Sequence, residues 1–241
     1  MNKISLGAAS GELSEERAKR DGRIHRPSPA VAFVGRHNSG KTTLLVRVIA
    51  ELVSRGFDIG SIKHHGHCDF DIDVPGKDSY RHREAGSRDV VVVSPTRMAR
   101  ITELNHEIEC DDIVSSMPDH DLVIVEGFRQ SGLDVIEVLR SGNDRDLPAA
   151  DEYCEIGTVR GVTPVAVVSN MESVHAAAKR RGTPSFSLED IEGIADFLQA
   201  VYVSSETYRC HSGGWGITSH GTKQGDGSLS WGEPLLTRIV E

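Results

Sequence analysis

Residues 35–42 read Gly-Arg-His-Asn-Ser-Gly-Lys-Thr, a stretch with the spacing GxxxxGK[ST]. A short apolar run, AVAFV, precedes it, and from Lys41 onward apolar residues recur at helical spacing. A strand, a tight turn and a helix in this order direct backbone N–H groups toward one point. Gly35 and Gly40 leave space for the chain to pass close to a phosphate. Lys41 can reach the phosphate oxygens and the Thr42 hydroxyl can bind Mg²⁺, so the stretch predicts a nucleoside triphosphate site.

The bulk composition is that of a globular protein without a nucleic-acid or membrane partner. Lys and Arg number 27 against 36 Asp and Glu, which gives a net charge of −9, whereas nucleic acid requires clustered positive charge. No apolar run approaches the roughly 18 residues of a membrane span, and the N-terminal residues lack the apolar core of a secretory signal. The 4 cysteines are dispersed, without a CxxC pair, as is usual in a reducing compartment. We therefore expect a cytoplasmic protein.

The chain divides into a polar N-terminal arm (residues 1–29), a nucleotide-binding domain (30–202) and a Gly/Ser/Thr-rich, flexible tail (203–241). Within the domain, strand and helix patterns alternate. Strands are predicted at 30–34, 59–63, 89–94, 120–126, 135–139 and 165–169, and helices at 77–85, 111–117, 173–180 and 188–202. This alternation predicts an α/β fold of the P-loop NTPase type, a three-layer αβα sandwich with a mostly parallel sheet. Ligands in such sheets bind at the carboxyl ends of the strands.

Glu126 ends the apolar segment 122–125 and is followed by Gly127. An acidic residue at the carboxyl edge of the sheet is in a position to hold Mg²⁺, or its water, opposite Thr42. The alternative is that this carboxylate caps a neighbouring helix. The usual residue at such a place is Asp, so the pattern is a glutamate variant of the magnesium site.

The segment after the second predicted strand contains Asp69, Asp71 and Asp73 at alternate positions. In an extended chain these carboxylates share one face, where they repel one another unless a cation lies between them. Asp71 is therefore a candidate third ligand for Mg²⁺. A solvated loop is the alternative interpretation.

A second cluster in the same segment consists of His64, His65, His67 and Cys68. Imidazole and thiolate are the usual ligands of zinc. Adjacent histidines point in different directions, however, and the sequence contains no second ligand cluster to complete the site. Contact with a phosphate or another oxyanion is therefore favoured over a transition-metal site.

Together these segments resemble the molybdopterin-guanine dinucleotide biosynthesis adapter protein (MobB) family. The resemblance extends from about residue 30 to 202 and is carried by four segments: NSGKTT at 38–43, IKH at 62–64, PGKDSYRHREAG at 75–86 and VEGF at 125–128. The third segment is the most specific. Family members often carry Lys after the Glu-Gly-Phe triplet, where this chain has Arg129, and Cys68 falls where family loops vary.

The resemblance implies a GTP-binding protein that forms a homodimer and has at most weak GTPase activity. The implied task is to assist the molybdenum cofactor guanylyltransferase, which joins GMP to molybdopterin. By position, the triphosphate would lie on Asn38, Ser39, Gly40, Lys41, Thr42 and Thr43, with Mg²⁺ on Glu126. Lys63, His64, Lys77, Asp78 and Ser79 would form a second polar surface for the phosphate of the molybdopterin cofactor or for the partner enzyme.

Two other functions and the base specificity stay open at this level. A small-metabolite kinase would need an arginine-rich lid, which is not visible between the later strands. A GTP-dependent metallochaperone would need paired Cys and His ligands, for which a single histidine run is a poor substitute. The NKxD motif that reads guanine in signalling GTPases is absent. Asn170, at the end of a predicted strand, is either a base-reading residue or a turn residue.

Overall fold

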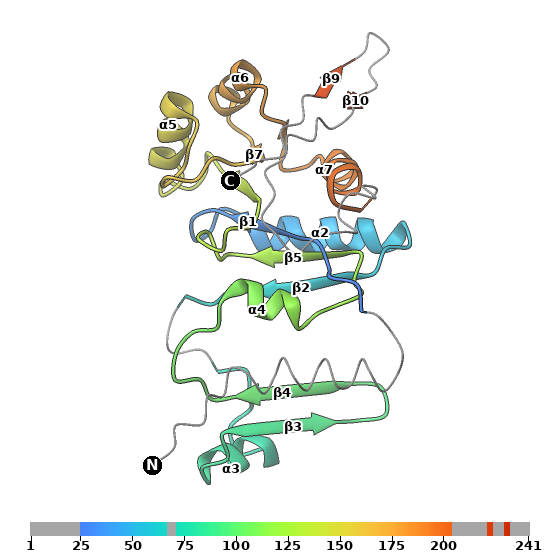
Figure 1. The fold of residues 1–241 in the computed structure, drawn as a ribbon. Helices are drawn as coiled ribbons and strands as arrows, with labels where there is room; N and C mark the ends of the chain where they lie inside the picture. Colours follow the sequence, from blue (N-terminus) through green and yellow to red (C-terminus); the bar gives the residue numbers. More distant parts are fainter. Residues whose placement is uncertain (1–24, 67–70, 204–220, 224–228, 232–241) are drawn as a thin grey trace, which may run out of the picture.

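The computed structural model describes residues 25–66, 71–203, 221–223 and 229–231. Its centre is a six-stranded sheet in the order β2-β5-β1-β6-β7-β8 (Figure 1). All the pairings in this sheet are parallel. The strands are β1 (Ala30–Val34), β2 (Ile59–Lys63), β5 (Leu122–Glu126), β6 (Val135–Leu139), β7 (Ala166–Ser169) and β8 (Ser185–Phe186). The predicted α/β fold is confirmed.

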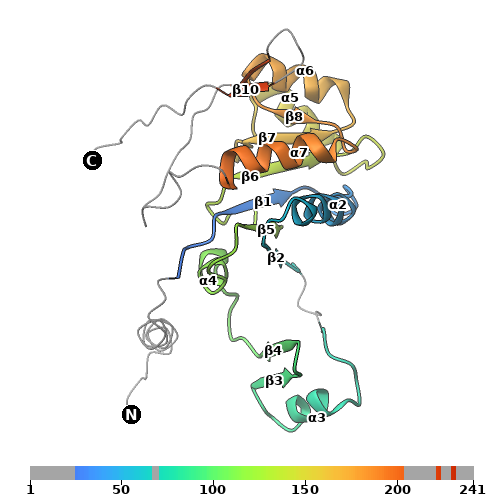
Figure 2. The same cartoon turned by 90° about the vertical axis from the view of Figure 1, so that its right-hand side faces the viewer.

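Helices cover both faces of the sheet. One face packs against α2 (Lys41–Ser54) and α7 (Ile191–Leu198), and the latter continues into a π-helical turn, η1 (Gln199–Val203). The other face packs against α4 (Cys110–Ser115), α5 (Leu147–Ile156) and α6 (Glu172–Arg181). Figure 2 shows α2 and α4 on opposite sides of β1, β5 and β2. The apolar runs of the central strands are buried on both faces, because helices lie on each side.

A separate unit lies beyond the β2 edge of the sheet (Figures 1 and 2). It consists of α3 (Asp78–Glu84) and an antiparallel pair, β3 (Asp89–Val93) and β4 (Met98–Thr102). We call it the hairpin unit. The strand predicted at 89–94 forms as β3, but four consecutive valines are typical of a buried strand, and burial is wrong for most of this run: Val91 and Val93 are 52% and 73% exposed. The run does form a strand, but a short turn returns the chain antiparallel into β4, and no helix carries it into the main sheet.

The predicted helices correspond to α3, α4, α6 and α7 with η1, whereas β4, α5 and the two-residue β8 were not predicted. Tyr202 attaches the last turn of the domain to the sheet, because its hydroxyl donates a 3.0 Å hydrogen bond to Asp134, the residue before β6. Most of the predicted arm and tail lies outside the described residues. Two short strands of the tail, β9 (Gly221–Lys223) and β10 (Leu229–Trp231), pair antiparallel. Among the helices that the structure describes, none is long and apolar enough to cross a membrane.

Candidate functional site

The glycine-rich loop joins the carboxyl end of β1 to the first turn of α2 at the carboxyl edge of the sheet. Gly35 has no space for a side chain, because a Cβ there would lie 2.5 Å from the carbonyl oxygen of Val138. Asn38 and Gly40 adopt left-handed conformations, with φ of 67° and 87°, which bend the chain back on itself. Ser39 is fully buried inside the bend. The loop thus wraps tightly around the start of the helix.

Lys41 lies within the curve of this loop. Its ammonium group donates hydrogen bonds to the carbonyl oxygens of Gly35 and Arg36, at 3.0 and 2.7 Å, and to the Ser39 hydroxyl at 3.2 Å. Burial lowers the pKa of Lys41, and the nearby carboxylates, first among them Glu126, act against that shift. The carbonyl oxygens and the hydroxyl of the loop therefore hold a single cation at this place. Thr43, in the first turn of α2, is exposed.

Thr42 and Glu126, two of the expected magnesium ligands, contact each other. The Thr42 hydroxyl donates a 2.7 Å hydrogen bond to Oε1 of Glu126. The ammonium group of Lys63 lies 3.0 Å from the same carboxylate oxygen and 3.2 Å from the Thr42 hydroxyl. Hydroxyl and carboxylate oxygens are the ligands that Mg²⁺ prefers, so this pair fits the ion. The family resemblance implied that Lys63 belongs to a second surface, whereas the structure brings it to the two expected magnesium ligands.

His64 fastens the end of β2 to the segment that follows Glu126. Its backbone N–H donates to the Glu126 carbonyl oxygen at 2.9 Å, and its ring stacks on Phe128 with centroids 4.2 Å apart. Nε2 lies 2.5 Å from a carboxylate oxygen of Glu107. Gly127, with φ of 104°, permits this contact, since a Cβ there would lie 2.8 Å from Cβ of His64. His64 is therefore a packing and hydrogen-bonding residue here.

The transition-metal interpretation of this histidine run gains nothing from the structure. Within the described part of the chain, no three His, Cys, Asp or Glu side chains are grouped so that they could hold a metal ion. His65 is described, whereas His67 and Cys68 lie outside the described residues.

Asp71 does not join Thr42 and Glu126. It accepts a 3.0 Å hydrogen bond from Arg83 and a 2.9 Å bond from the backbone N–H of Asp73. These two bonds, the backbone one first, lower the pKa of the Asp71 carboxyl. The prediction of Asp71 as a magnesium ligand is thus not supported. The cation beside Asp71 and Asp73 is the guanidinium group of Arg83 on α3.

The remaining members of the expected second surface lie at the start of α3. Lys77 is the N-cap residue of this helix and Asp78 is its first residue. The Ser79 hydroxyl donates a 2.8 Å hydrogen bond to Asp73. The expected surface is therefore divided between the sheet edge and the hairpin unit.

Behind the loop lies a buried ion pair that the sequence analysis missed. Arg129 donates to both carboxylate oxygens of Glu137, at 2.5 and 2.8 Å, and Glu137 is only 1% exposed. Burial raises the pKa of Glu137, and the bonds to Arg129 act against this shift. Glu137 pairs in register with Val34, the residue before the loop. The feature of the sequence that could have indicated this ion pair is the glutamate within the otherwise apolar strand VIEVL.

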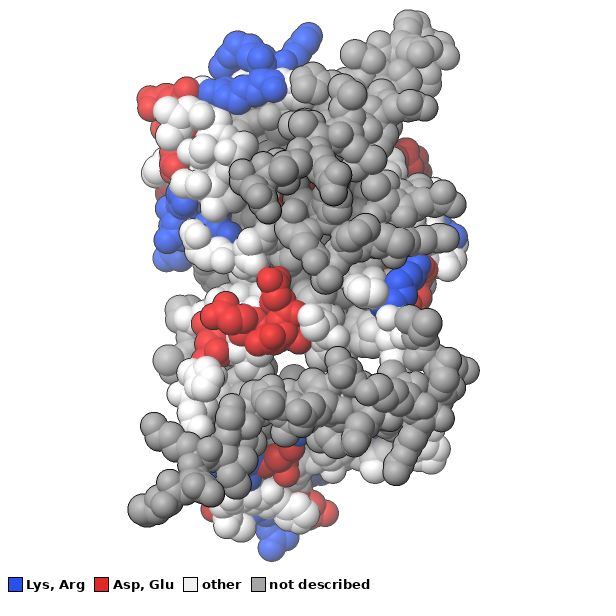
Figure 3. Space-filling model, viewed as in Figure 1, with Lys and Arg blue, Asp and Glu red and all other residues white. Residues whose placement is uncertain are grey.

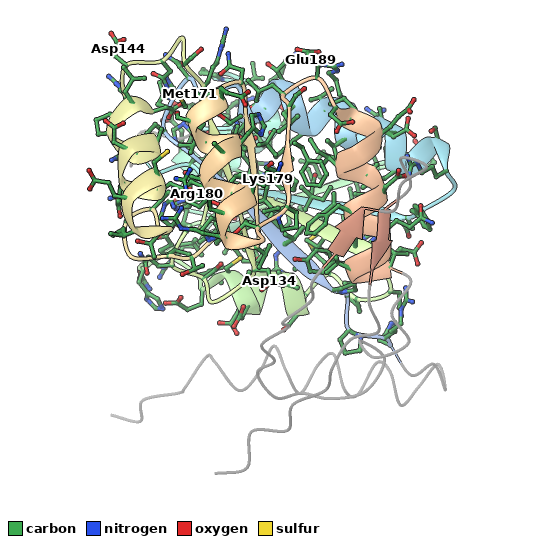
Figure 4. All side chains as sticks on the ribbon, turned by 90° about the horizontal axis from the view of Figure 1, so that it is seen from above. Asp134, Asp144, Met171, Lys179, Arg180 and Glu189 are labelled. Carbon is green, nitrogen blue, oxygen red and sulfur yellow. The ribbon has the colours of Figure 1, made fainter. Side chains whose placement is uncertain are left out.

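The loops after β6 and β7 are tied to one another and to the glycine-rich loop. Asn143 donates to the His37 carbonyl oxygen at 3.0 Å. The Asn170 amide accepts from the backbone N–H of Ser141 at 2.8 Å and donates to the Ser141 hydroxyl at 2.9 Å. Figure 4 shows Asp144 and Met171, from these loops, along one edge of the molecule, with Asp134 at the opposite edge. Asn170 thus joins two loops beside the site, and its role as a base reader stays a prediction.

Comparison with known proteins places this geometry in a family. The family model described as "Molybdopterin guanine dinucleotide synthesis protein B" matches residues 30–159. The chain is similar to the molybdopterin-guanine dinucleotide biosynthesis adapter protein of Escherichia coli (strain K12), with 36% identity over 176 residues, 70% of this chain and 91% of that protein. The protein of the same name from Haemophilus influenzae is 38% identical over 127 residues, 52% of this chain and 71% of the relative.

Solved structures agree with the assignment. A crystal structure of molybdopterin-guanine biosynthesis protein B (mobB) matches with a TM-score of 0.52 and 28% identity, over 71% of this chain and 99% of the other. The structure of Bacillus subtilis MobB matches with a TM-score of 0.57 over 73% of this chain and 99% of the other, and at 22% identity it supports the fold alone. From the family model, the two relatives and the fold, we conclude that the chain belongs to the MobB family.

Proposed function

We propose that the protein is a GTP-binding adapter in molybdenum cofactor biosynthesis. It assists the guanylyltransferase that attaches GMP to molybdopterin, which yields the guanine dinucleotide form of the cofactor. The observation that carries this proposal is the loop that encloses Lys41 beside the Thr42–Glu126 pair. The printed names of the relatives, biosynthesis adapter proteins, supply the pathway.

In this proposal different residues of the site bind the phosphates and the magnesium ion. The backbone N–H groups of residues 38–43 and the ammonium group of Lys41 bind the phosphates, aided by the positive end of α2. Thr42 and Glu126 supply oxygens for Mg²⁺, which when bound neutralises phosphate charge. Hydrolysis by the protein alone is expected to be slow, in keeping with an adapter.

We do not propose nucleic acid as a partner, because one face of the protein is acidic. Figure 3 shows acidic side chains gathered over α4, whose first turn carries Asp111 and Asp112. A nucleic acid backbone would be repelled by this face.

The partners that we propose are GTP, the guanylyltransferase, the molybdopterin cofactor and a second copy of the chain, all in the cytoplasm. We propose that the cofactor phosphate or the enzyme contacts the start of α3, at Lys77, Asp78 and Ser79.

The proposal is tested by measuring nucleotide binding and enzyme capture together. Calorimetry in magnesium buffer should show GTP binding and weaker ATP binding. Immobilised protein should retain the purified guanylyltransferase, and its retention should differ between GTP and nucleotide-free buffer. Absence of heat with both nucleotides would refute the nucleotide site. Acceptor-stimulated phosphate transfer faster than about 1 s⁻¹ would instead indicate a small-metabolite kinase.

The homodimer is supported by the exposed face of the hairpin. Cross-strand register places Val91 and Val93 of β3 and Met98 of β4 on one face, and their exposed fractions are 52%, 73% and 71%. A two-stranded hairpin is marginally stable alone, so a face with these apolar side chains gains from burial against a partner. The same face carries Arg100, opposite Val91, in an ion pair with Asp89. A second copy presents the same face, so a two-fold contact between copies can bury the apolar side chains of both.

Charging this face should therefore separate the dimer. In the double variant Val93→Lys/Met98→Lys, light scattering after gel filtration should report a mass near that of one chain, with an unchanged circular dichroism spectrum. Ile156→Lys, at a 66% exposed position of α5, serves as the matched control and should leave the mass of the wild type. A double variant that still forms dimers would exclude the hairpin face as the interface.

A further inference from the structure

Lys63 occupies a position that the nucleotide site as proposed does not explain. Its ammonium group contacts both oxygens assigned to the metal, Oε1 of Glu126 at 3.0 Å and the Thr42 hydroxyl at 3.2 Å. The backbone determines this position, because Lys63 is the last residue of β2 and pairs in register with Glu126 on β5. A monovalent cation of the chain itself thus lies where a divalent ion would bind.

The end of β2 is anchored, whereas the Lys63 side chain has room to move. His64, the next residue, is held by its backbone bond to Glu126 and by its ring contact with Phe128. The Lys63 side chain is 57% exposed, and the Glu126 side chain is 15% exposed. A lysine has a flexible four-carbon stem, so the ammonium group can leave the carboxylate by side-chain rotation without displacing the strand.

We propose that Lys63 makes the divalent-cation site conditional on the triphosphate, an inference that rests on the proposed nucleotide site. Without nucleotide, the ammonium group neutralises Glu126 and repels a divalent ion from the same oxygens. A bound triphosphate offers the ammonium group new anionic acceptors. Lys63 then turns from Glu126 to the phosphates, and the Thr42 and Glu126 oxygens become available to the metal. Metal and nucleotide therefore bind together, and metal alone binds weakly.

The test measures Mn²⁺ binding by electron paramagnetic resonance, first without nucleotide. Wild-type protein should bind Mn²⁺ weakly, and Lys63→Met should bind one ion about tenfold or more tightly, since a repelling charge at close range is gone. Lys179→Met, at an exposed position on α6, is the matched control and should behave as the wild type. Adding Glu126→Gln to Lys63→Met should remove the gained affinity, which ties the gain to this carboxylate.

A second measurement separates a charge effect from a structural one. Calorimetry of GTP in EDTA should show weaker binding to Lys63→Met than to the wild type, by about tenfold, because one phosphate contact is lost. Lys63→Gln, which keeps a polar head, should follow Lys63→Met in both measurements. Circular dichroism confirms folding of each variant.

The outcomes distinguish this inference from the proposed function. Equal Mn²⁺ affinity of wild type and Lys63→Met without nucleotide, with GTP bound normally by the wild type, would overturn the inference and leave the GTP site standing. Failure of the wild type to bind GTP with or without metal would overturn both. Tight Mn²⁺ binding by the nucleotide-free wild type would likewise overturn the inference alone.

Discussion

Replacing Lys41 with alanine is expected to weaken binding of GTP with Mg²⁺ by about a hundredfold or more, because a hydrogen-bonded cation facing the phosphates is lost. Lys41 is the cation enclosed by the glycine-rich loop, where it contacts two carbonyl oxygens and the Ser39 hydroxyl. In the proposed GTP complex, we expect the ammonium group to exchange these loop contacts for contacts with phosphate oxygens. Isothermal titration calorimetry of the variant and the wild type measures the difference.

The same experiment needs a control for overall charge and for folding. Lys179→Ala removes one positive charge from an exposed position on α6 and should leave GTP affinity within about twofold, because exposed charges are screened by salt. The melting temperature of Lys41→Ala shows whether the loop still folds. Unchanged GTP affinity in a folded Lys41→Ala protein would mean that the triphosphate binds elsewhere.

Replacing Arg129 with methionine is expected to lower the free energy of unfolding at pH 7 by about 3–5 kcal/mol, because a buried carboxylate loses its partner. Glu137 is 1% exposed and receives both of its short hydrogen bonds from Arg129. Urea denaturation followed by circular dichroism measures the loss. The double variant Arg129→Met/Glu137→Leu should recover most of it, because no uncompensated charge remains.

The loss of unfolding free energy in Arg129→Met should also depend on pH, and it should grow as the pH rises. Burial raises the pKa of Glu137 already in the wild type, and without Arg129 only the weaker effect of the Lys41 charge opposes the shift. The folded variant then binds a proton that the unfolded chain releases above its ordinary carboxyl pKa, so stability falls as pH rises from about 4.5. The variant should therefore be closer to wild type at pH 5 than at pH 8. An equal difference at both pH values would show that Glu137 is not the cause.

Much of the fold and part of the site follow from local sequence. The glycine-rich loop, the strand before it and the helix after it are contiguous, so their pattern predicts their geometry. The apolar run ending at Glu126 is equally local, and the parallel order of the strands brings that carboxylate to Thr42. Helix α5 was missed because its alanines and its charged residues give a weak apolar period.

The sequence by itself predicted the glycine-rich loop, the αβα architecture and the family, because each is recognised from short segments whose own residues are close together along the chain. Only the tertiary structure decided which charged side chains, distant along the chain, form ion pairs or hydrogen bonds with one another. In the folded protein Lys63 contacts the Thr42–Glu126 pair. Asp71 is hydrogen-bonded to Arg83, and Glu137 to Arg129. The tertiary structure also places the valine run of β3 in the two-stranded sheet with β4 and not in the main sheet. Electrostatic pairing acts through space between strands and helices whose register no local pattern specifies.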